Sequence, residues 1–252
     1  MNHSYLNKKI NEYYNASTDA WINVHGNNRI EGFSFSKELE EHDKILETYF
    51  DFKDGEKVLD AGCGVGYPGV SFAKKYPFTF FYLININGYQ LSKISDVPEN
   101  ISIFKCDFNS LLFPSNFFDK IYFLESFSHS LKKTETIKEI YRVLKPGGKV
   151  FLLDFCRKPE IDRKKLKIHR EVYFHFPIFS KLLKTLFLNK GFKELFFIEN
   201  MINNIYTPDY YNTNTFYCYD KNNNLTDFGK IHEKIFINNA HVQYPIFCAY
   251  QK

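Results

Sequence analysis

A glycine-rich turn is the first stretch of this 252-residue chain whose residue types and spacing suggest chemistry. In VLDAGCGVG, residues 58–66, an apolar run ends in Asp60, and Gly62, Gly64 and Gly66 follow at alternate positions. Glycine has no side chain and tolerates positive φ, so a ligand can approach such a turn closely. A purely structural strand-to-helix turn explains these residues equally well when they are taken alone.

The chemistry of the turn favours a ligand without phosphate groups. A dinucleotide-binding turn has its third glycine where this chain has Tyr67, and the carboxylate of Asp60 would repel a nearby diphosphate. The ligand should therefore lack phosphate and be neutral or cationic near Asp60. S-adenosylmethionine meets both conditions, because it carries a sulfonium and an ammonium group and no phosphate. We therefore expect S-adenosylmethionine as the cofactor, and we expect no metal.

Acid–base residues form the second group. LESFSHS at 124–130 contains Glu125 and His129, and LLDF at 152–155 contains Asp154. Methyl transfer needs a positioned electron-rich atom and often a base that removes its proton. A neutral histidine suits that role, so His129 is a candidate base, with Asp154 to orient its ring. The structural alternatives are a helix-start contact for His129 and a turn-holding role for Glu125.

Strands of a parallel sheet would bring these residues together. Short apolar runs alternate with helical segments, which predicts parallel strands joined by crossover helices. The expected strands lie at 57–61, 78–84, 101–107, 119–126 and 149–155. A sixth is expected after residue 192 and a seventh at 244–250. The expected helices lie at 34–50, 67–76, 88–94, 133–144 and 180–190.

The composition is that of a globular chain. Hydrophobic residues make up 44%, and the net charge of +4 is too small to suggest a nucleic-acid partner. The basic run RKKLKIHR at 163–170 suits phosphates or an acidic substrate, although a solvated helix face explains it better. The five cysteines form no CxxC pair and no apolar signal or membrane-spanning segment is present, so we expect free thiols and a soluble, cytoplasmic protein. The sequence does not predict an oligomeric state.

The spaced elements VLDAGCGVG, CDF, FFDKIYFLES and EIYRVLKPGGKVFLLDF closely resemble class I S-adenosylmethionine-dependent methyltransferases. The resemblance implies an α/β, doubly wound Rossmann-like sheet of seven strands with an antiparallel last strand. It also implies a single domain over 1–252, with an N-terminal helical lid at 1–50, a cofactor-binding core at 51–156, and substrate-side helices and last strands at 157–252. The residues that it assigns to the cofactor are Asp60, Gly62, Cys63, Gly64, Gly66, Asn85, Ile86, Gln90, Asp107, Phe108 and Glu125.

One position departs from the family pattern. The second strand usually ends in an acidic residue that accepts both ribose hydroxyls, and this chain has Asn85 there. An amide offers one acceptor and one donor contact without charge-assisted strength, and Gln90 is expected to compensate. The alternative is that Asn85 caps the following short helix. A neutral residue followed by Gln resembles the branch of sterol, isoprenoid and cyclopropane-forming C-methylating enzymes, and also some natural-product O-methyltransferases.

The resemblance suggests two chemistries for the acid–base residues. ESFSH and GVGYPG resemble macrolide, rifamycin and indolocarbazole O-methyltransferases, which place a base histidine and an aspartate at the positions of His129 and Asp154. In isoprenoid C-methyltransferases, the residue that matches Glu125 instead stabilises a carbocation and then removes a proton. Because all three residues are present, we predict a catalyst, and these three are the catalytic candidates.

The acceptor is expected to be a small, apolar or aromatic metabolite. Tyr14, Trp21 and His25 lie where relatives carry a lid, and they are the expected substrate contacts. We predict O-methylation in preference to C-methylation. RNA methylation has only the basic run in its favour, and an S-adenosylmethionine-binding partner protein without catalysis is the alternative from a different class.

Overall fold

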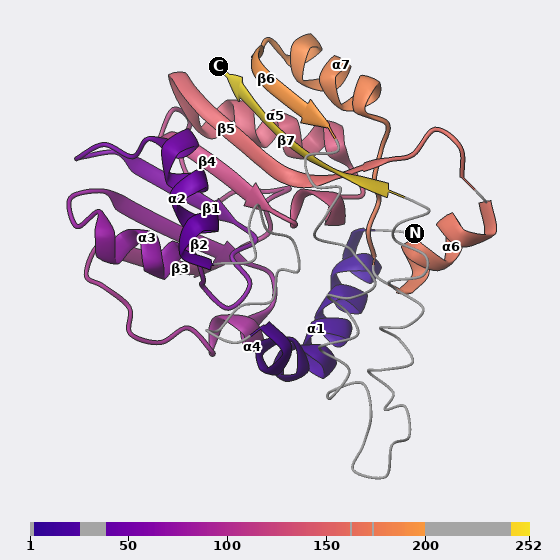
Figure 1. Cartoon of the computed structure of the whole chain (residues 1–252), viewed down its shortest axis with the longest axis horizontal. Coiled ribbons are helices and arrows are strands. Elements are labelled where there is room, and N and C mark those ends of the chain that lie inside the picture. Colours follow the sequence, from indigo (N-terminus) through magenta and orange to yellow (C-terminus); the bar gives the residue numbers. More distant parts are fainter. Residues whose placement is uncertain (1–2, 26–38, 162, 173, 200–242) are drawn as a thin grey trace.

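The computed structural model describes residues 3–25, 39–161, 163–172, 174–199 and 243–252. Its centre is a seven-stranded sheet in the order β3-β2-β1-β4-β5-β7-β6 (Figure 1). The strands are β1 Lys57–Ala61, β2 Phe80–Asn85, β3 Ile101–Lys105, β4 Phe118–Leu124, β5 Leu144–Arg157, β6 Lys193–Glu199 and β7 Gln243–Gln251. Neighbours from β3 to β5 pair in parallel, whereas β7 runs antiparallel to both β5 and β6. The predicted fold class is confirmed.

Helices cover both faces of the sheet. They are α1 His3–His25, α2 Leu39–Phe50, α3 Gly69–Lys75, α4 Gly88–Leu91, α5 Lys133–Val143, α6 Arg163–Val172 and α7 Ser180–Lys190, with the 3-10 turn η1 at Phe127–His129. Phe50 of α2 and Phe72 of α3 pack in one buried cluster with Phe81 of β2. Ile140 of α5 and Phe187 of α7 pack in a second cluster on the other face. The helices α2, α3, α5 and α7 therefore bury their apolar sides against the sheet, as a doubly wound fold requires.

The order of the strands reverses between β1 and β4, and ligands of open α/β sheets bind at such a point beyond the carboxyl ends of the strands. α1 lies across this edge next to α4 (Figure 1). Leu6 and Ile10 of α1 are buried there with Phe174. The N-terminal segment thus forms a helix that packs at this edge of the sheet, and its role as a lid stays a prediction.

Four of the cysteines, at positions 63, 106, 156 and 248, are buried free thiols, and Cys218 lies outside the described residues. Residues 34–38 of the expected second helix also lie outside them. None of the helices within the described ranges combines the length and apolar character of a membrane span.

Candidate functional site

The glycine turn connects β1 to α3 at the carboxyl edge of the sheet. Gly62 and Gly66 have φ of +89° and +94°, a region that side chains rarely adopt. A Cβ at Gly62 would lie 2.5 Å from the Cβ of Ser126. The N–H groups of Gly62 and Cys63 both donate to the Ile84 carbonyl, which fixes the turn against β2. The turn therefore has the bare, closely packed backbone that the methionine part of S-adenosylmethionine would need.

Asp60 lies beneath this turn. Its side chain is 3% exposed, and its Oδ2 accepts a hydrogen bond of 2.9 Å from the Tyr122 hydroxyl. A Cβ at Gly69 would lie 3.0 Å from the same oxygen, so α3 begins directly against the carboxylate. Asp60 therefore braces β1, β4 and α3 around the turn. Its expected contact with the cofactor stays a prediction.

A buried amide network lies at the end of β2. The Asn85 Nδ2 donates to the Gly64 carbonyl at 3.2 Å and to Gln90 Oε1 at 2.7 Å. The Asn85 Oδ1 accepts from the Asn87 N–H at 3.1 Å, which leaves one acceptor position for a ribose hydroxyl. Gln90 donates in turn to the Thr18 hydroxyl of α1 at 3.3 Å. The pairing of Asn85 with Gln90 agrees with a shared role at the ribose.

The cap of α4 is Asn87, so the capping alternative for Asn85 is wrong. The Asn87 Oδ1 accepts from the Gln90 N–H at 2.8 Å, and its Nδ2 donates to Asn15 of α1 at 2.9 Å. Ile86, between the two asparagines, packs against the apolar cluster of α1. The side chains after β2 thus hold α4 and α1 together.

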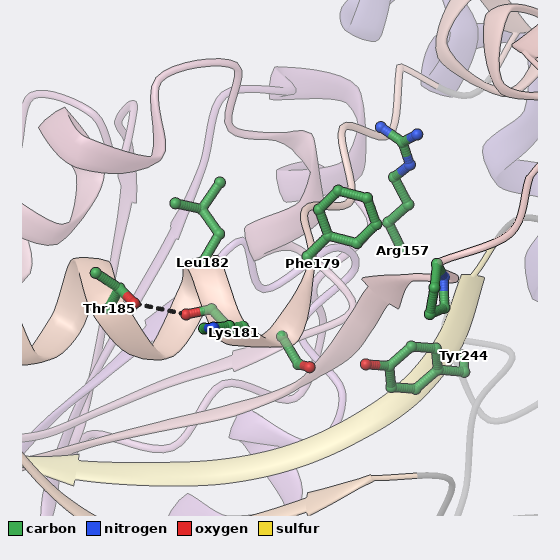
Figure 2. A pocket seen from close by; sticks show the side chains of 8 residues that line it. Arg157, Phe179, Lys181, Leu182, Thr185 and Tyr244 are labelled. Atoms are coloured by element: carbon green, nitrogen blue, oxygen red, sulfur yellow. Dashed lines mark hydrogen bonds between the residues drawn. The ribbon is translucent and has the colours of Figure 1, made fainter.

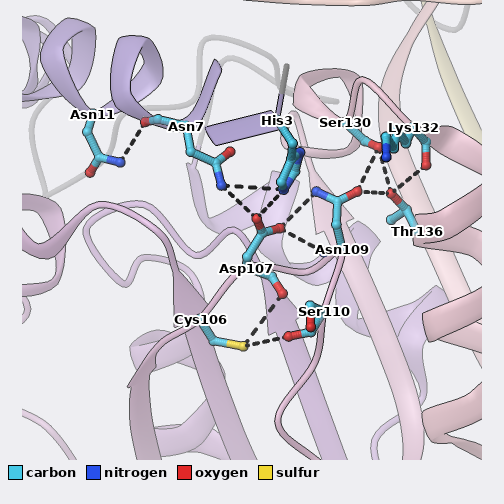
Figure 3. Close-up of polar contacts among 10 residues, drawn as sticks. All are labelled: His3, Asn7, Asn11, Cys106, Asp107, Asn109, Ser110, Ser130, Lys132 and Thr136. Atoms are coloured by element: carbon cyan, nitrogen blue, oxygen red, sulfur yellow. Dashed lines mark hydrogen bonds and ion pairs between the residues drawn. The ribbon is translucent and has the colours of Figure 1, made fainter. Parts of the chain in front are cut away.

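Asp107 follows β3 and accepts four hydrogen bonds (Figure 3). Its Oδ1 accepts from the N–H and the Nδ2 of Asn109, both at 2.8 Å. Its Oδ2 accepts from Asn7 Nδ2 at 2.8 Å and lies 2.7 Å from His3 Nε2. Burial opposes ionisation of Asp107, but these hydrogen bonds outweigh it and place the pKa below its ordinary value. Asp107 is therefore a carboxylate able to accept an adenine amino group.

The first two turns of α1 contact the residues expected at the adenine. An amino group at Asp107 would share or replace the donors from His3 and Asn7, because the carboxylate already accepts four bonds. Phe108 packs edge-on against Phe123, with 5.5 Å between ring centres. The site therefore has both a polar and an aromatic side for an adenine.

Glu125 and His129 follow β4. Glu125 has φ of +51°, and its N–H donates to the Leu153 carbonyl of β5 at 2.8 Å. A left-handed backbone at a residue other than glycine is costly, and such positions cluster at functional sites. His129 ends η1 directly beyond it. β4 and η1 thus bring both residues to the edge that α1 covers.

The contacts of His129 indicate which ring nitrogen carries its proton. His129 Nδ1 lies 3.2 Å from the Phe174 carbonyl, an acceptor, so Nδ1 is the protonated nitrogen. The Nε2 then accepts from the Tyr14 hydroxyl at 2.8 Å and lies 3.2 Å from His175 Nε2. The pKa of Tyr14 is raised well above its ordinary value by burial, and then by Tyr13 and the charges of Glu125 and Asp154. Tyr14 is therefore a neutral donor to His129.

Asp154 does not hydrogen-bond to the His129 ring, so the predicted orienting contact is wrong. Its Oδ2 accepts from the Ser128 N–H at 3.1 Å and its Oδ1 from the Phe155 N–H at 2.8 Å. Burial raises the pKa of Asp154, and the nearby Lys133 opposes that rise. Asp154 does not contact the imidazole because its two oxygens accept hydrogen bonds from the backbone N–H groups of Ser128 and Phe155.

Lys133 holds the other side of the same turn. Its Nζ donates to the carbonyls of Phe127, Ser128 and Ser130, at 2.7, 3.1 and 2.7 Å. Burial lowers the pKa of Lys133 to about 7, although Asp154 raises it. The turn that carries His129 is therefore fixed by a lysine on its carbonyls and a carboxylate on an N–H.

Of the expected substrate contacts, Tyr14 reaches the acid–base residues. Trp21 is half-buried and lies about two turns further along α1. The side chain of His25, at the end of α1, lies outside the described residues. His3, Asn7, Lys133 and His175 join the site although no spacing in the sequence marks them.

Comparison with known proteins relates this chain to methyltransferases. Residues 59–152 match the family described as "Methyltransferase domain". Sterol 24-C-methyltransferase ERG6A of Gibberella zeae is 33% identical over 173 residues, which cover 64% of this chain and 44% of that protein. Sterol 24-C-methyltransferase ERG6 of Saccharomyces cerevisiae is 29% identical over 229 residues, which cover 81% of this chain and 58% of that protein. The chain thus spans about half the length of the curated relatives it matches.

Solved structures share the fold over nearly the whole chain. The [4+2]-cyclase SpnF has a TM-score of 0.81 at 17% identity, and the match covers 98% of this chain and 96% of that one. Geranyl diphosphate C-methyltransferase of Streptomyces coelicolor has a TM-score of 0.72 at 11% identity, with 98% and 97% covered. One fold therefore supports several chemistries. The family match over residues 59–152, the sterol methyltransferase relatives and this shared fold together support the predicted resemblance to class I S-adenosylmethionine-dependent methyltransferases.

Proposed function

We propose that the protein methylates a carbon atom of a small apolar acceptor. The supporting observation is the placement of two carboxyl groups on neighbouring strands, because the N–H of Glu125, directly after β4, donates to Leu153, the residue before Asp154 in β5. S-adenosylmethionine would supply an electrophilic methyl group on its sulfonium. Glu125, at its left-handed position after β4, would then face the acceptor where positive charge develops.

Carbon methylation makes a specific demand on these residues. When the π electrons of an alkene form the new carbon–carbon bond, the neighbouring carbon of the acceptor becomes cationic. Loss of a proton from the next carbon restores the double bond. A carboxylate near that carbon stabilises the cation and accepts the proton, and we assign this role to Glu125. The sterol 24-C-methyltransferases among the relatives favour the same choice of atom.

The contacts of His129 reduce the support for O-methylation. A base for an acceptor hydroxyl needs a free lone pair. The lone pair on the Nε2 of His129 already accepts from the Tyr14 hydroxyl, and the same nitrogen lies 3.2 Å from His175 Nε2. O-methylation stays a second candidate because Nε2 is the unprotonated nitrogen. An acceptor hydroxyl could then replace the hydroxyl of Tyr14.

Three variants distinguish these proposals once an acceptor has been found. Glu125→Gln should lower turnover by roughly 10²- to 10⁴-fold, the usual range for a general base, whereas His129→Ala should have a much smaller effect. Glu135→Gln is the matched control, because Glu135 is an exposed residue of α5. The affinity for S-adenosylmethionine, measured by calorimetry, separates loss of chemistry from loss of cofactor. Near-parental turnover of Glu125→Gln with an inactive His129→Ala would refute carbon methylation in favour of oxygen.

A further inference from the structure

Asn109 lies between Asp107, the carboxylate expected at the adenine, and the end of the turn η1 (Figure 3). Its N–H and its Nδ2 both donate to Asp107 Oδ1, each at 2.8 Å. Its Oδ1 accepts from the hydroxyl of Thr136 in α5 at 2.5 Å and from that of Ser130 at 3.1 Å. The side chain thus connects Asp107 to the residue that directly follows His129.

The partners of Asn109 determine which way its amide points. An ionised carboxylate only accepts hydrogen bonds, so the amide nitrogen must face Asp107. The amide oxygen then faces the two hydroxyls, which can donate to it. Thr136 and Ser130 are both buried, so water has little access to this end of the amide. A reversed amide would place its oxygen 2.8 Å from a carboxylate oxygen, and Asn109 therefore has one favoured orientation.

The two oxygens of Asp107 have different surroundings. The Oδ2 meets His3 and Asn7 of α1, whereas the printed donors to Oδ1 both belong to Asn109. An adenine amino group would share or replace the donors from α1, and the bonds from Asn109 would stay. Burial opposes the ionisation of Asp107, and the bonds from Asn109 are among those that outweigh it and lower its pKa. Asn109 therefore fixes one oxygen of the carboxylate while the other faces α1.

We propose that Asn109 is a positioning residue, which holds the Asp107 carboxylate in the direction that accepts the adenine amino group. The terminal torsion of an aspartate is broad, so donors on one oxygen are needed to fix the direction of the other. Asn109 acts through Asp107, and the hydroxyls of Thr136 and Ser130 act through Asn109. The proposal rests on the assignment of S-adenosylmethionine to this site and not on the atom that is methylated.

The test is calorimetry of the full chain with S-adenosylhomocysteine, the demethylated cofactor, at about pH 8 and about pH 5.5. Asn109→Asp keeps an oxygen towards Thr136 but places a second carboxylate against Asp107. Two carboxylates at this distance do not ionise together, and at low pH they share a proton that restores the lost hydrogen bond. Asn109→Asp should therefore bind roughly tenfold more weakly than the parent at the higher pH and approach the parent at the lower pH. Asn109→Ala cannot hold the proton and should bind weakly at both, and Asn189→Asp, which alters an exposed residue of α7, should bind like the parent.

Thr136 gives a second readout that leaves Asn109 and Asp107 in place, and it decides the proposal if Asn109→Asp does not fold. Thr136→Val has a similar shape and lacks the hydroxyl that orients the amide, so it should weaken S-adenosylhomocysteine binding by roughly two- to tenfold, the effect of one neutral hydrogen bond. Thr136→Ser keeps the hydroxyl and should bind like the parent. Thr185→Val is the matched control, because the Thr185 hydroxyl, at the cavity beside the start of α7, donates to the Lys181 carbonyl of its own helix (Figure 2). Parental affinity of Thr136→Val would contradict the proposal.

Asp107→Ala in the same assay distinguishes two failures. If it binds S-adenosylhomocysteine like the parent, or if the parent does not bind, the assignment of the cofactor fails and the proposal fails with it. If Asp107→Ala binds weakly while Asn109→Asp binds like the parent at both pH values, or weakly at both, the positioning role of Asn109 alone is refuted. The titratable neighbours His3 of α1, Cys106 and Glu139 of α5 are kept in every variant, so the comparison with Asn109→Ala cancels their effect.

Discussion

Replacement of the buried lysine behind η1 should change how stability depends on pH. Lys133 is 7% exposed, and its Nζ lies 2.7, 3.1 and 2.7 Å from three backbone carbonyls, to all of which only the protonated amine can donate at once. Burial lowers its pKa from 10.5 to about 7. Between these values the unfolded chain holds a proton on this amine that the folded chain lacks. Folding therefore releases a proton, and the free energy of unfolding rises with pH.

The size of the effect follows from these two pKa values. One proton released on folding changes the free energy of unfolding by about 1.4 kcal/mol per pH unit, so the rise from about pH 7.5 to about pH 9 is ~2 kcal/mol. Urea unfolding of the parent and of Lys133→Met at both pH values should show this rise in the parent and its loss in the variant. Lys138→Met, an exposed lysine of α5, should keep the rise. The same pH dependence in the parent and Lys133→Met would refute a neutral buried amine.

Three further changes test the cofactor residues. Gly62→Ala should abolish S-adenosylmethionine binding, because its Cβ would lie 2.5 Å from Ser126, whereas Gly55→Ala, with φ of +77° and nothing within 4 Å, should bind like the parent in calorimetry. Asn85→Asp should lower the free energy of unfolding by about 1–3 kcal/mol in urea, since it removes the hydrogen bonds to Gly64 and Gln90. A stability equal to that of the parent would contradict that network. Asp107→Ala should weaken S-adenosylmethionine binding by roughly tenfold, the effect of one charge-assisted hydrogen bond, and unchanged affinity would remove Asp107 from the adenine site.

Sequence patterns predicted the parts of the fold that local residues determine. The strand expected at 57–61 and the helix expected at 180–190 have the observed bounds of β1 and α7. The former is an apolar run closed by a glycine turn, and the latter ends at Gly191, whose φ of +104° terminates a helix. The strand expected from residue 78 begins instead at Phe80, because the Thr79 N–H donates to Tyr76 in a turn.

Long-range contacts of the site could not be predicted in this way. His3 and Asn7 reach Asp107 across 104 and 100 residues, and no periodicity relates them. Lys133 has the sequence of an exposed helix start, yet its amine turns inward to three carbonyls. His175 lies in an aromatic stretch and meets His129 through the packing of the segment before α7. The acid–base candidates were found because they follow strands, but their partners depend on tertiary packing.

Transfer of an isotope-labelled methyl group tests the central claim most directly. The purified chain would be incubated with S-adenosylmethionine carrying a ¹³C-labelled methyl group and a panel of apolar acceptors, namely alkenes such as sterols and isoprenoids together with hydroxylated aromatic compounds. NMR spectroscopy of the products identifies the atom that receives the label. If the protein methylates carbon with Glu125 as the base, the label should be bonded to a carbon atom of an alkene acceptor. Glu125→Gln should then form no labelled product. A label found only on oxygen, and retained in Glu125→Gln, would contradict it.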